Sequence, residues 1–197
     1  YNNQYGTKEL LKKCNDQTLG ILYGSSLSVY GNKKQNGISE DTSCKPGSAL
    51  AKSRFECEQI ISNEMKKDGK YAFLLRPRMM IGKGDQYTFQ GLNKMIRKNV
   101  ILGDGSQNVS LISTEDYSEI MLKLIDYIYN QPNNDKKIEA LNIGYAEPIQ
   151  MNDMVDIICK NEKLPWPKKN IKANPILLFF LKLLPIQGLK RLAYEIE

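Results

Sequence analysis

The 197-residue chain has the composition of a soluble globular protein, with 41% apolar residues, 25% charged residues and a formal net charge of +6. Its basic residues are scattered in short pairs, without a long tract interleaved with aromatics, which favours a solvated surface and argues against nucleic-acid binding. Because the chain has no histidine, it contains neither a Ser-His catalytic pair nor a zinc site.

The four cysteines show no C-x-x-C spacing and no framework of a small secreted domain. They are Cys14, Cys44, Cys57 and Cys159. Reduced thiols in a cytoplasmic protein are the expected state.

The first elements in chain order are a short helix and a strand. The helix is expected over Thr7–Cys14, with Thr7 as its cap. An apolar run follows at Leu19–Tyr23 and stops at Gly24-Ser25-Ser26, which is typical of a buried strand in a parallel sheet. In open α/β sheets ligands bind beyond the carboxyl ends of the strands, so the two serine hydroxyls are candidate site groups.

A long helix and a second apolar strand come next. The helix is predicted over Ser48–Lys67 and ends at Asp68-Gly69, and the strand is predicted over Tyr71–Pro77. Shorter elements follow from Gln86 onward. They are a helix at Phe89–Arg97, strands at Val100–Leu102 and Val109–Ile112, a helix from Thr114 with Ile120, Met121, Leu124, Ile125 and Ile128 on its inner face, and a helix at Asn152–Cys159.

Several motifs occur in a fixed order along residues 3–160. They are Asn3-Gln4-Tyr5-Gly6-Thr7, the Ser25–Gly31 run ending in Val-Tyr-Gly, Leu75-Arg76-Pro77 followed by Gly82, Gly84 and Asp85, and Leu141-Asn142-Ile143-Gly144 followed by Glu147-Pro148. In this order the set resembles the extended short-chain dehydrogenase/reductases, the NAD-dependent epimerase/dehydratase superfamily.

The resemblance implies an α/β fold containing only the later strands of a Rossmann-type doubly wound parallel sheet. Residues 1–85 would be the C-terminal part of the dinucleotide-binding domain, and residues 86–197 a small α+β substrate-binding region. The family's G-x-x-G-x-x-G turn does not occur in the chain, which implies that the sequence is the C-terminal portion of a longer protein.

The resemblance also implies the site residues. Ser26 falls on the catalytic serine, which holds the substrate oxygen. The Tyr-x-x-x-Lys pair of the family falls on Leu50 and Arg54, because Pro46, Ser48, Ser53 and Glu58 all keep the family's register; a rival register pairs Ser48 with Lys52 but loses the Ser53 match. Neither register supplies a tyrosine.

An NAD or NADP cofactor would be held by Arg54, at its ribose, and by the segment containing Pro77, Met79 and Met80, whose backbone passes beneath the nicotinamide in the family. Leu50 has no proton to give, and losing a positioned acid or base typically costs about 10²–10⁴-fold in rate. The resemblance therefore implies a dehydrogenase or epimerase that is catalytically degenerate.

The substrate branch depends on two places. Nucleotide-sugar epimerases and dehydratases hold a diphosphate with an Asn after the Arg-Pro pair and an Arg-Asp after the Gly-Asp-Gly turn, where this chain has Met79 and Val109-Ser110. These apolar residues favour the 3β-hydroxysteroid dehydrogenase-like branch, which oxidises or reduces apolar, sterol-like secondary alcohols and ketones. Two alternatives stay open: a nucleotide-sugar epimerase or dehydratase, and a non-catalytic relic or binding module.

The stretch 175–185, PILLFFLKLLP, is the most apolar of the chain. At eleven residues it is too short to span a bilayer as a helix, which needs about twenty. It is expected to line the core or a pocket, or else to contact a membrane surface. The expected partners are a small-molecule substrate and either a second copy of the chain or a missing N-terminal half.

Overall fold

The computed structural model describes residues 2–31, 35, 37–85, 88–130 and 137–171. They fall into two compact units. The first unit comprises Tyr1–Arg78 with Ile112–Gly144, and the second comprises Met79–Leu111 with Tyr145–Glu197. This division differs from the expected boundary after residue 85, because the segment 112–144 returns to the first unit; which region binds cofactor or substrate stays a prediction.

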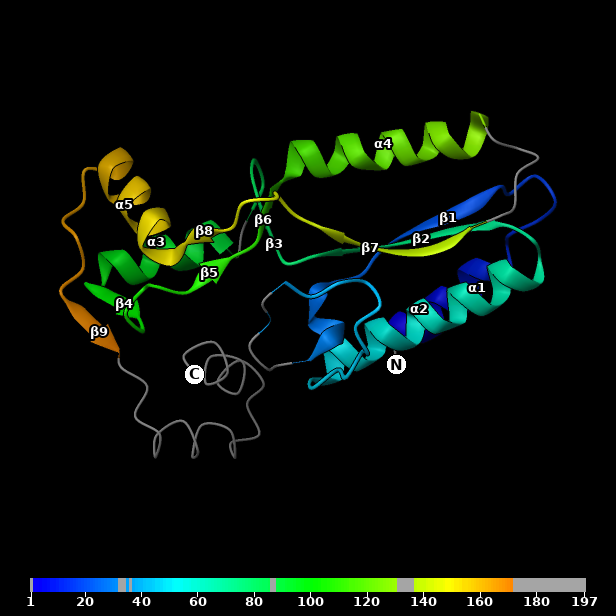
Figure 1. The fold of residues 1–197 in the computed structure, drawn as a ribbon, viewed down its shortest axis with the longest axis horizontal. Helices are drawn as coiled ribbons and strands as arrows, with labels where there is room; N and C mark the ends of the chain where they lie inside the picture. Colours follow the sequence, from blue (N-terminus) through cyan, green and yellow to red (C-terminus); the bar gives the residue numbers. More distant parts are fainter. Residues whose placement is uncertain (1, 32–34, 36, 86–87, 131–136, 172–197) are drawn as a thin grey trace. The chain divides into compact units, whose positions relative to one another are not determined.

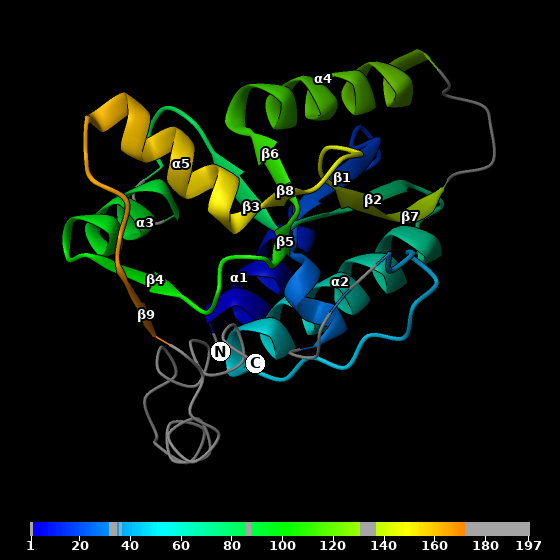
Figure 2. The same cartoon turned by 60° about the vertical axis from the view of Figure 1, so that its left-hand side comes forward.

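The first unit is built on a parallel three-stranded sheet, which confirms the predicted α/β class. Its strands are β1 (Gly20–Gly24), β2 (Tyr71–Pro77) and β7 (Ile138–Ile143), in the order β1-β2-β7. The helices α1 (Asn2–Leu11) and α2 (Ala49–Lys67) lie on one face of the sheet, and α4 (Thr114–Asn130) lies on the other (Figures 1 and 2).

Helices on both faces bury the middle strand completely. All seven residues of β2 are buried, as expected for a parallel strand covered on both sides. On the α2 face, Ile61 and Met65 pack with Ala72 and Leu74. On the α4 face, the rings of Tyr71 and Phe73 meet Tyr127 edge-on, with centroids 6.1 Å apart in each pair.

The bounds of α2 follow from residues at its two ends. Ser48 caps the first turn, with its hydroxyl accepting a hydrogen bond from the Ala51 N–H at 3.1 Å. Asp68 ends the helix, and Gly69 takes a positive φ of 61° directly after it. The predicted ranges of the helix and of the following strand are therefore confirmed.

Three details of the first unit differ from expectation. The first helix begins at Asn2, and Thr7 does not cap it: its hydroxyl donates to Cys57 Sγ at 3.4 Å. The strand β1 is half-buried rather than buried, because it lies at one end of the strand order. Ile125 is 37% exposed, and Tyr127 faces the sheet instead, because Ile125 lies about 100° around the helix from Leu124.

The second unit contains short elements around two small cores. It comprises β3 (Met79–Ile81), α3 (Thr88–Arg97), β4 (Val100–Leu102), β5 (Asn108–Val109), β8 (Ile149–Gln150), α5 (Met151–Glu162) and β9 (Lys169–Ile171), and β6 (Leu111–Ser113) leads from it into the first unit. β4 pairs with β9 in parallel and β5 with β8 antiparallel. α3 packs on α5 through Ile96, Val155 and Ile158.

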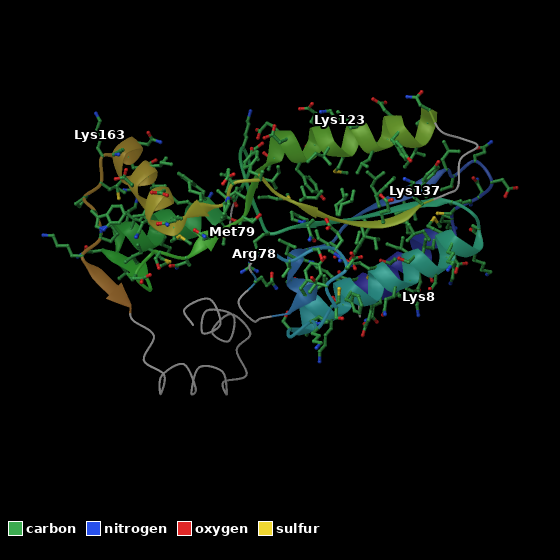
Figure 3. All side chains as sticks on the ribbon, in the orientation of Figure 1. Lys8, Arg78, Met79, Lys123, Lys137 and Lys163 are labelled. Atoms are coloured by element: carbon green, nitrogen blue, oxygen red, sulfur yellow. The ribbon has the colours of Figure 1, made fainter. Side chains whose placement is uncertain are left out.

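The positive charge is spread over the described surface. Lys8, Lys123, Lys137 and Lys163, labelled in Figure 3, come from four different places in the chain and are all exposed. Among the described helices, none combines the length and apolarity needed to cross a membrane. The stretch 175–185, expected to line a pocket or contact a membrane, lies outside the described residues.

Candidate active site

The site begins where β1 ends. The Ser25 N–H donates to the Leu75 carbonyl at 2.7 Å, which continues the ladder with β2 by one residue. The chain then turns into the short 3₁₀ helix η1 (Leu27–Tyr30), whose cap is Ser26: its Oγ accepts from the Ser28 N–H at 3.2 Å. No described residue accepts a hydrogen bond from the Ser26 hydroxyl, so its proton is available to a substrate oxygen.

The backbone that follows η1 requires a glycine. Gly31 has a φ of 121°, and a Cβ atom there would lie 2.8 Å from the Lys45 carbonyl oxygen. A side chain would therefore push apart η1 and the segment that leads to α2. The Val-Tyr-Gly ending of the motif thus holds the Ser26 turn in place.

Ser25 adds a second hydroxyl at the strand end. The residue is only 6% exposed, and its Oγ has no hydrogen-bond partner among the described residues. A buried hydroxyl without a partner is costly, so such groups usually bond to water or to a bound molecule. The carboxyl end of β1 therefore has unused hydrogen-bonding capacity.

Leu50 and Arg54 lie in the first turns of α2. Leu50 is 46% exposed, and Arg54 follows one turn later and is half-buried. Phe55, next to Arg54, packs against Leu27 and Val29 of η1. The structure thus brings the first half of α2 against the turn that Ser26 caps.

Tyr23 is a site neighbour that the sequence did not single out. Its phenol lies within interaction range of the Cys57 thiol of α2. Burial raises the pKa of Tyr23 strongly, Cys57 raises it further, and the nearby positive charge of Arg54 lowers it. The signal in the sequence was strand alternation, since Ile21 and Tyr23 face the same side of β1 and pack in the same cluster as Ile61 of α2.

A buried charge pair lies beneath the site. Arg76 of β2 donates from Nε and Nη2 to the two carboxylate oxygens of Glu58, at 3.0 and 2.6 Å, and from Nη1 to the Tyr30 hydroxyl at 2.7 Å. The side chains of Arg76 and Glu58 are 6% and 2% exposed. Burial lowers the pKa of Arg76, but the bonds to Glu58 and its negative charge more than offset this and raise the pKa above its usual value.

The network continues to the third strand. The Tyr30 hydroxyl donates to Asn142 Oδ1 at 2.9 Å, and Asn142 Nδ2 donates to the Ile38 carbonyl at 3.2 Å. The backbone N–H of Asn142 donates to a carboxylate oxygen of Glu40 at 2.8 Å. The sequence signal for this network was an arginine inside an apolar strand, since a buried cation needs a partner.

The remaining predicted residues divide between the units. Pro77 is buried at the end of β2 in the first unit. Met79 and Met80 lie in β3 of the second unit, where Met79 packs with Val109, Leu111 and Met154. Ser26, Leu50, Arg54 and Pro77 therefore share one unit, while the cofactor-binding roles of Arg54, Pro77, Met79 and Met80 stay predictions.

Comparison with known proteins identifies a family and several relatives. Residues 1–144 match the model of the NAD dependent epimerase/dehydratase family. An uncharacterized protein, y4nG of Sinorhizobium fredii, is 25% identical over 161 residues, which is 80% of this chain and 39% of that protein.

Solved structures with the same fold include epimerases of nucleotide sugars. UDP-glucuronic acid 4-epimerase from Bacillus cereus, solved with NAD, has a TM-score of 0.73 at 20% identity, covering 98% of this chain and 66% of that one. UDP-N-acetylglucosamine 4-epimerase from Methanobrevibacter ruminantium has a TM-score of 0.69 at 21% identity, covering 88% and 57%. RMD from Pseudomonas aeruginosa, complexed with NADPH, has a TM-score of 0.68 at 17% identity, covering 86% and 60%.

The chain thus spans less than two thirds of the length of these relatives. Because the family model covers most of the chain, the fold and the family are settled together. The chain belongs to the NAD-dependent epimerase/dehydratase family.

Proposed function

We propose that this chain supplies substrate-site residues of an NAD(P)-dependent enzyme that acts on a secondary carbinol of a nucleotide sugar. The observation that carries the proposal is the Ser26 hydroxyl, held at the carboxyl end of a parallel strand beside the α2 segment that contains Arg54. The family match and the nucleotide-sugar epimerases among the structural neighbours favour this substrate class over the sterol-like one expected from the sequence.

Each site residue has a proposed task. Ser26 holds the reacting oxygen, because one hydroxyl can accept from the Ser28 N–H and still donate to a ligand. Arg54 binds a ribose hydroxyl of the cofactor through its guanidinium. Pro77, Met79 and Met80 line the nicotinamide with their backbone. Leu50 occupies the position of the acid/base, but its side chain has no group that can give or take a proton. Proton transfer is therefore the step that this chain performs poorly.

The described residues fit one end of a nicotinamide dinucleotide. The unpartnered, buried Ser25 hydroxyl and the Arg54 guanidinium offer donors for ribose or amide oxygens. The described residues show no such fit at the pyrophosphate end. The turn at Gly103 and Gly105 leads into the strand β5 rather than into a helix, and at the helix after Gly82 and Gly84 the first free N–H groups already donate to the Asp85 carboxylate. A bound nicotinamide would take up or return the hydride, and this chain's part is to orient the carbinol.

A sterol-like substrate is the second candidate, and one contact favours it. Val109, at the place where nucleotide-sugar enzymes have an arginine, is buried against Met79 and Leu111. An apolar cluster supplies neither a donor nor a cation for a diphosphate. A non-catalytic binding module is the third candidate, and the exposed Leu50 favours it. A cytoplasmic location, a homodimer and membrane contact through 175–185 also remain proposals.

The test restores the missing chemistry. The chain is joined to the dinucleotide-binding half of a relative, and Leu50→Tyr with Arg54→Lys is compared with the unchanged fusion. Oxidation of UDP-sugars and of 3β-hydroxysterols is followed by absorbance of the reduced nicotinamide. Turnover of a UDP-sugar should rise about 10²-fold or more, which is the scale of a restored acid/base.

Two controls define the outcomes. Leu50→Phe with Arg54→Lys adds the same ring without the hydroxyl and should give no gain, and Ser26→Ala in the restored background should reduce the rate again. Turnover of sterols instead of UDP-sugars would move the proposal to the second candidate. Demonstrated cofactor binding without turnover of either class would leave the binding-module candidate.

A further inference from the structure

The Arg76 guanidinium contacts two structural elements that carry the candidate site. Two of its nitrogens bond to Glu58 of α2, and the third bonds to Tyr30 of η1. Its centre also lies 4.9 Å from the centroid of the Tyr30 ring. The planar guanidinium meets both partners in a fixed geometry, with two parallel bonds to the carboxylate, which a lysine ammonium on its flexible stem does not provide.

On the helix side, this contact fixes the rotation of α2. Glu58 follows Arg54 by four residues, so the two side chains lie on one face of the helix. Glu58 is 2% exposed and bound at both carboxylate oxygens, so it cannot turn away from β2 without breaking two bonds. The direction in which Arg54 leaves the helix is set by the same rotation.

On the turn side, the contact fixes η1. Tyr30 is the last residue of η1, and Ser26 is its cap. The Tyr30 hydroxyl is held from both directions, since it accepts from Arg76 and donates to Asn142. Through Ile38 and Glu40, Asn142 also holds the segment that leads from η1 toward α2.

Stability alone gives a weak reason for this arrangement. Desolvating two charges costs about as much as their attraction returns, and apolar residues of similar volume in place of a buried pair are often neutral or stabilising. An ion pair whose role is to position other elements can be told from one whose role is to stabilise the fold. When apolar residues replace a positioning pair, the fold should stay intact while the elements that the pair joined become more mobile.

We infer that Arg76 is a positioning residue: with Glu58 and Tyr30 it locks α2 against η1, and so holds Arg54 and Ser26 in fixed relation at the candidate site. The role of that site rests on the proposed function, but the lock itself is a property of the chain and is measured without substrate.

The test replaces the pair by apolar residues in the full chain, as Glu58→Leu with Arg76→Met. Hydrogen exchange of peptides is read by mass spectrometry, and urea unfolding is measured in parallel. Unfolding should stay cooperative, with a midpoint near that of the parent. Exchange should quicken about three- to tenfold, the scale of one lost hydrogen bond, in the peptides covering Ser26–Gly31 and Ala49–Cys57 and not in those from α4.

A second variant keeps the proposal falsifiable if the double variant does not fold. Tyr30→Phe removes one hydroxyl, leaves the Glu58 bonds in place, and should loosen η1 but not α2. In an NMR spectrum the amide proton of Ser28, which bonds to Ser26 Oγ, should move upfield in this variant. That signal reports on the Ser26 turn itself and not on overall stability.

The matched control removes an exposed ion pair on α4, as Glu119→Leu with Lys123→Met, and should leave both site peptides unchanged. The inference is overturned if the Glu58 and Arg76 replacement leaves both peptides as protected as in the parent, or quickens exchange equally in every peptide. If both peptides keep their protection from hydrogen exchange, the ion pair has no effect on α2 or η1 beyond packing. If protection falls equally in every peptide, the ion pair contributes to overall stability only. Neither result depends on activity, so failure here is distinguishable from failure of the proposed function.

Discussion

Removal of one partner from the buried pair is the sharpest stability prediction. In Glu58→Ala the Arg76 guanidinium stays on a side chain that is only 6% exposed, and both of its bonds to the carboxylate are lost. A cation left there must either keep its charge without a partner or draw water into the interface between α2 and β2. Either outcome favours the unfolded chain, in which the guanidinium is hydrated.

The loss in free energy of unfolding caused by Glu58→Ala can be derived in two independent ways. Each hydrogen bond to a charged group contributes about 1.5–3 kcal/mol, so two such bonds give about 3–6 kcal/mol. Mutational studies in which one partner of a buried pair is deleted give about 3–5 kcal/mol. Domains of this kind have a free energy of unfolding of about 5–15 kcal/mol, so the substitution removes a large fraction of it. The variant is expected to unfold at a much lower urea concentration than the parent.

The assay is equilibrium unfolding in urea, followed by circular dichroism at several protein concentrations. Glu56→Ala is the matched control, because Glu56 lies two residues earlier on the exposed side of the same helix. The control should change the free energy of unfolding by less than about 0.5 kcal/mol. Equal losses in Glu56→Ala and Glu58→Ala would refute the reasoning, because both would then reflect helix propensity alone.

Three further predictions follow from local contacts. Gly20→Ala should cost about 1–3 kcal/mol in thermal unfolding, because its Cβ would lie 2.7 Å from the Tyr71 carbonyl oxygen, whereas Gly6→Ala, with open space around it, should be neutral or stabilising. Ser48→Ala should cost about 1 kcal/mol in urea unfolding through loss of the α2 cap, and retained stability would mean that the cap is dispensable. Burial raises the pKa of Tyr23, so the phenol keeps its proton in the folded chain at a pH where the unfolded chain loses it. The free energy of unfolding that is linked to this shift is fully present below a pH of about 10 and is lost as the pH rises above it. Tyr23→Phe should therefore flatten the fall in the free energy of unfolding measured above a pH of about 10.

The sequence predicted best the elements whose first and last residues are typical of the ends of a helix or strand. Ser48 and Asp68-Gly69 bound α2, and the run Tyr71–Pro77 gave β2 its correct limits. These signals are local, so they do not depend on which elements meet. The face of α4 was predicted less well, because a regular apolar period allowed Ile125 inward while the bulkier Tyr127 fills the space beside Phe73.

Long-range pairing could not be predicted in the same way. An arginine within β2 implies a buried partner, but spacing does not reveal which of the chain's acids supplies it, and Asn142 lies 112 residues after Tyr30. The return of 112–144 to the first unit is likewise invisible in local periodicity. The apolar residues Met79 and Val109 favoured a sterol-like substrate, but they report which residues pack around them rather than which ligand is bound.

The order in which the strands are made has a consequence for the newly synthesised chain. β2 ends at Pro77, but its neighbour β7 begins only at Ile138, after the Met79–Leu111 segment of the second unit and after α4. At about 5–20 residues per second, a ribosome needs roughly 3–12 s to make the intervening sixty or so residues. During that interval the apolar edge of β2 that will receive β7 lacks its partner, and open strand edges of this kind promote aggregation. Synthesis speed between these two strands should therefore affect the soluble yield of this protein more than synthesis speed after Ile143.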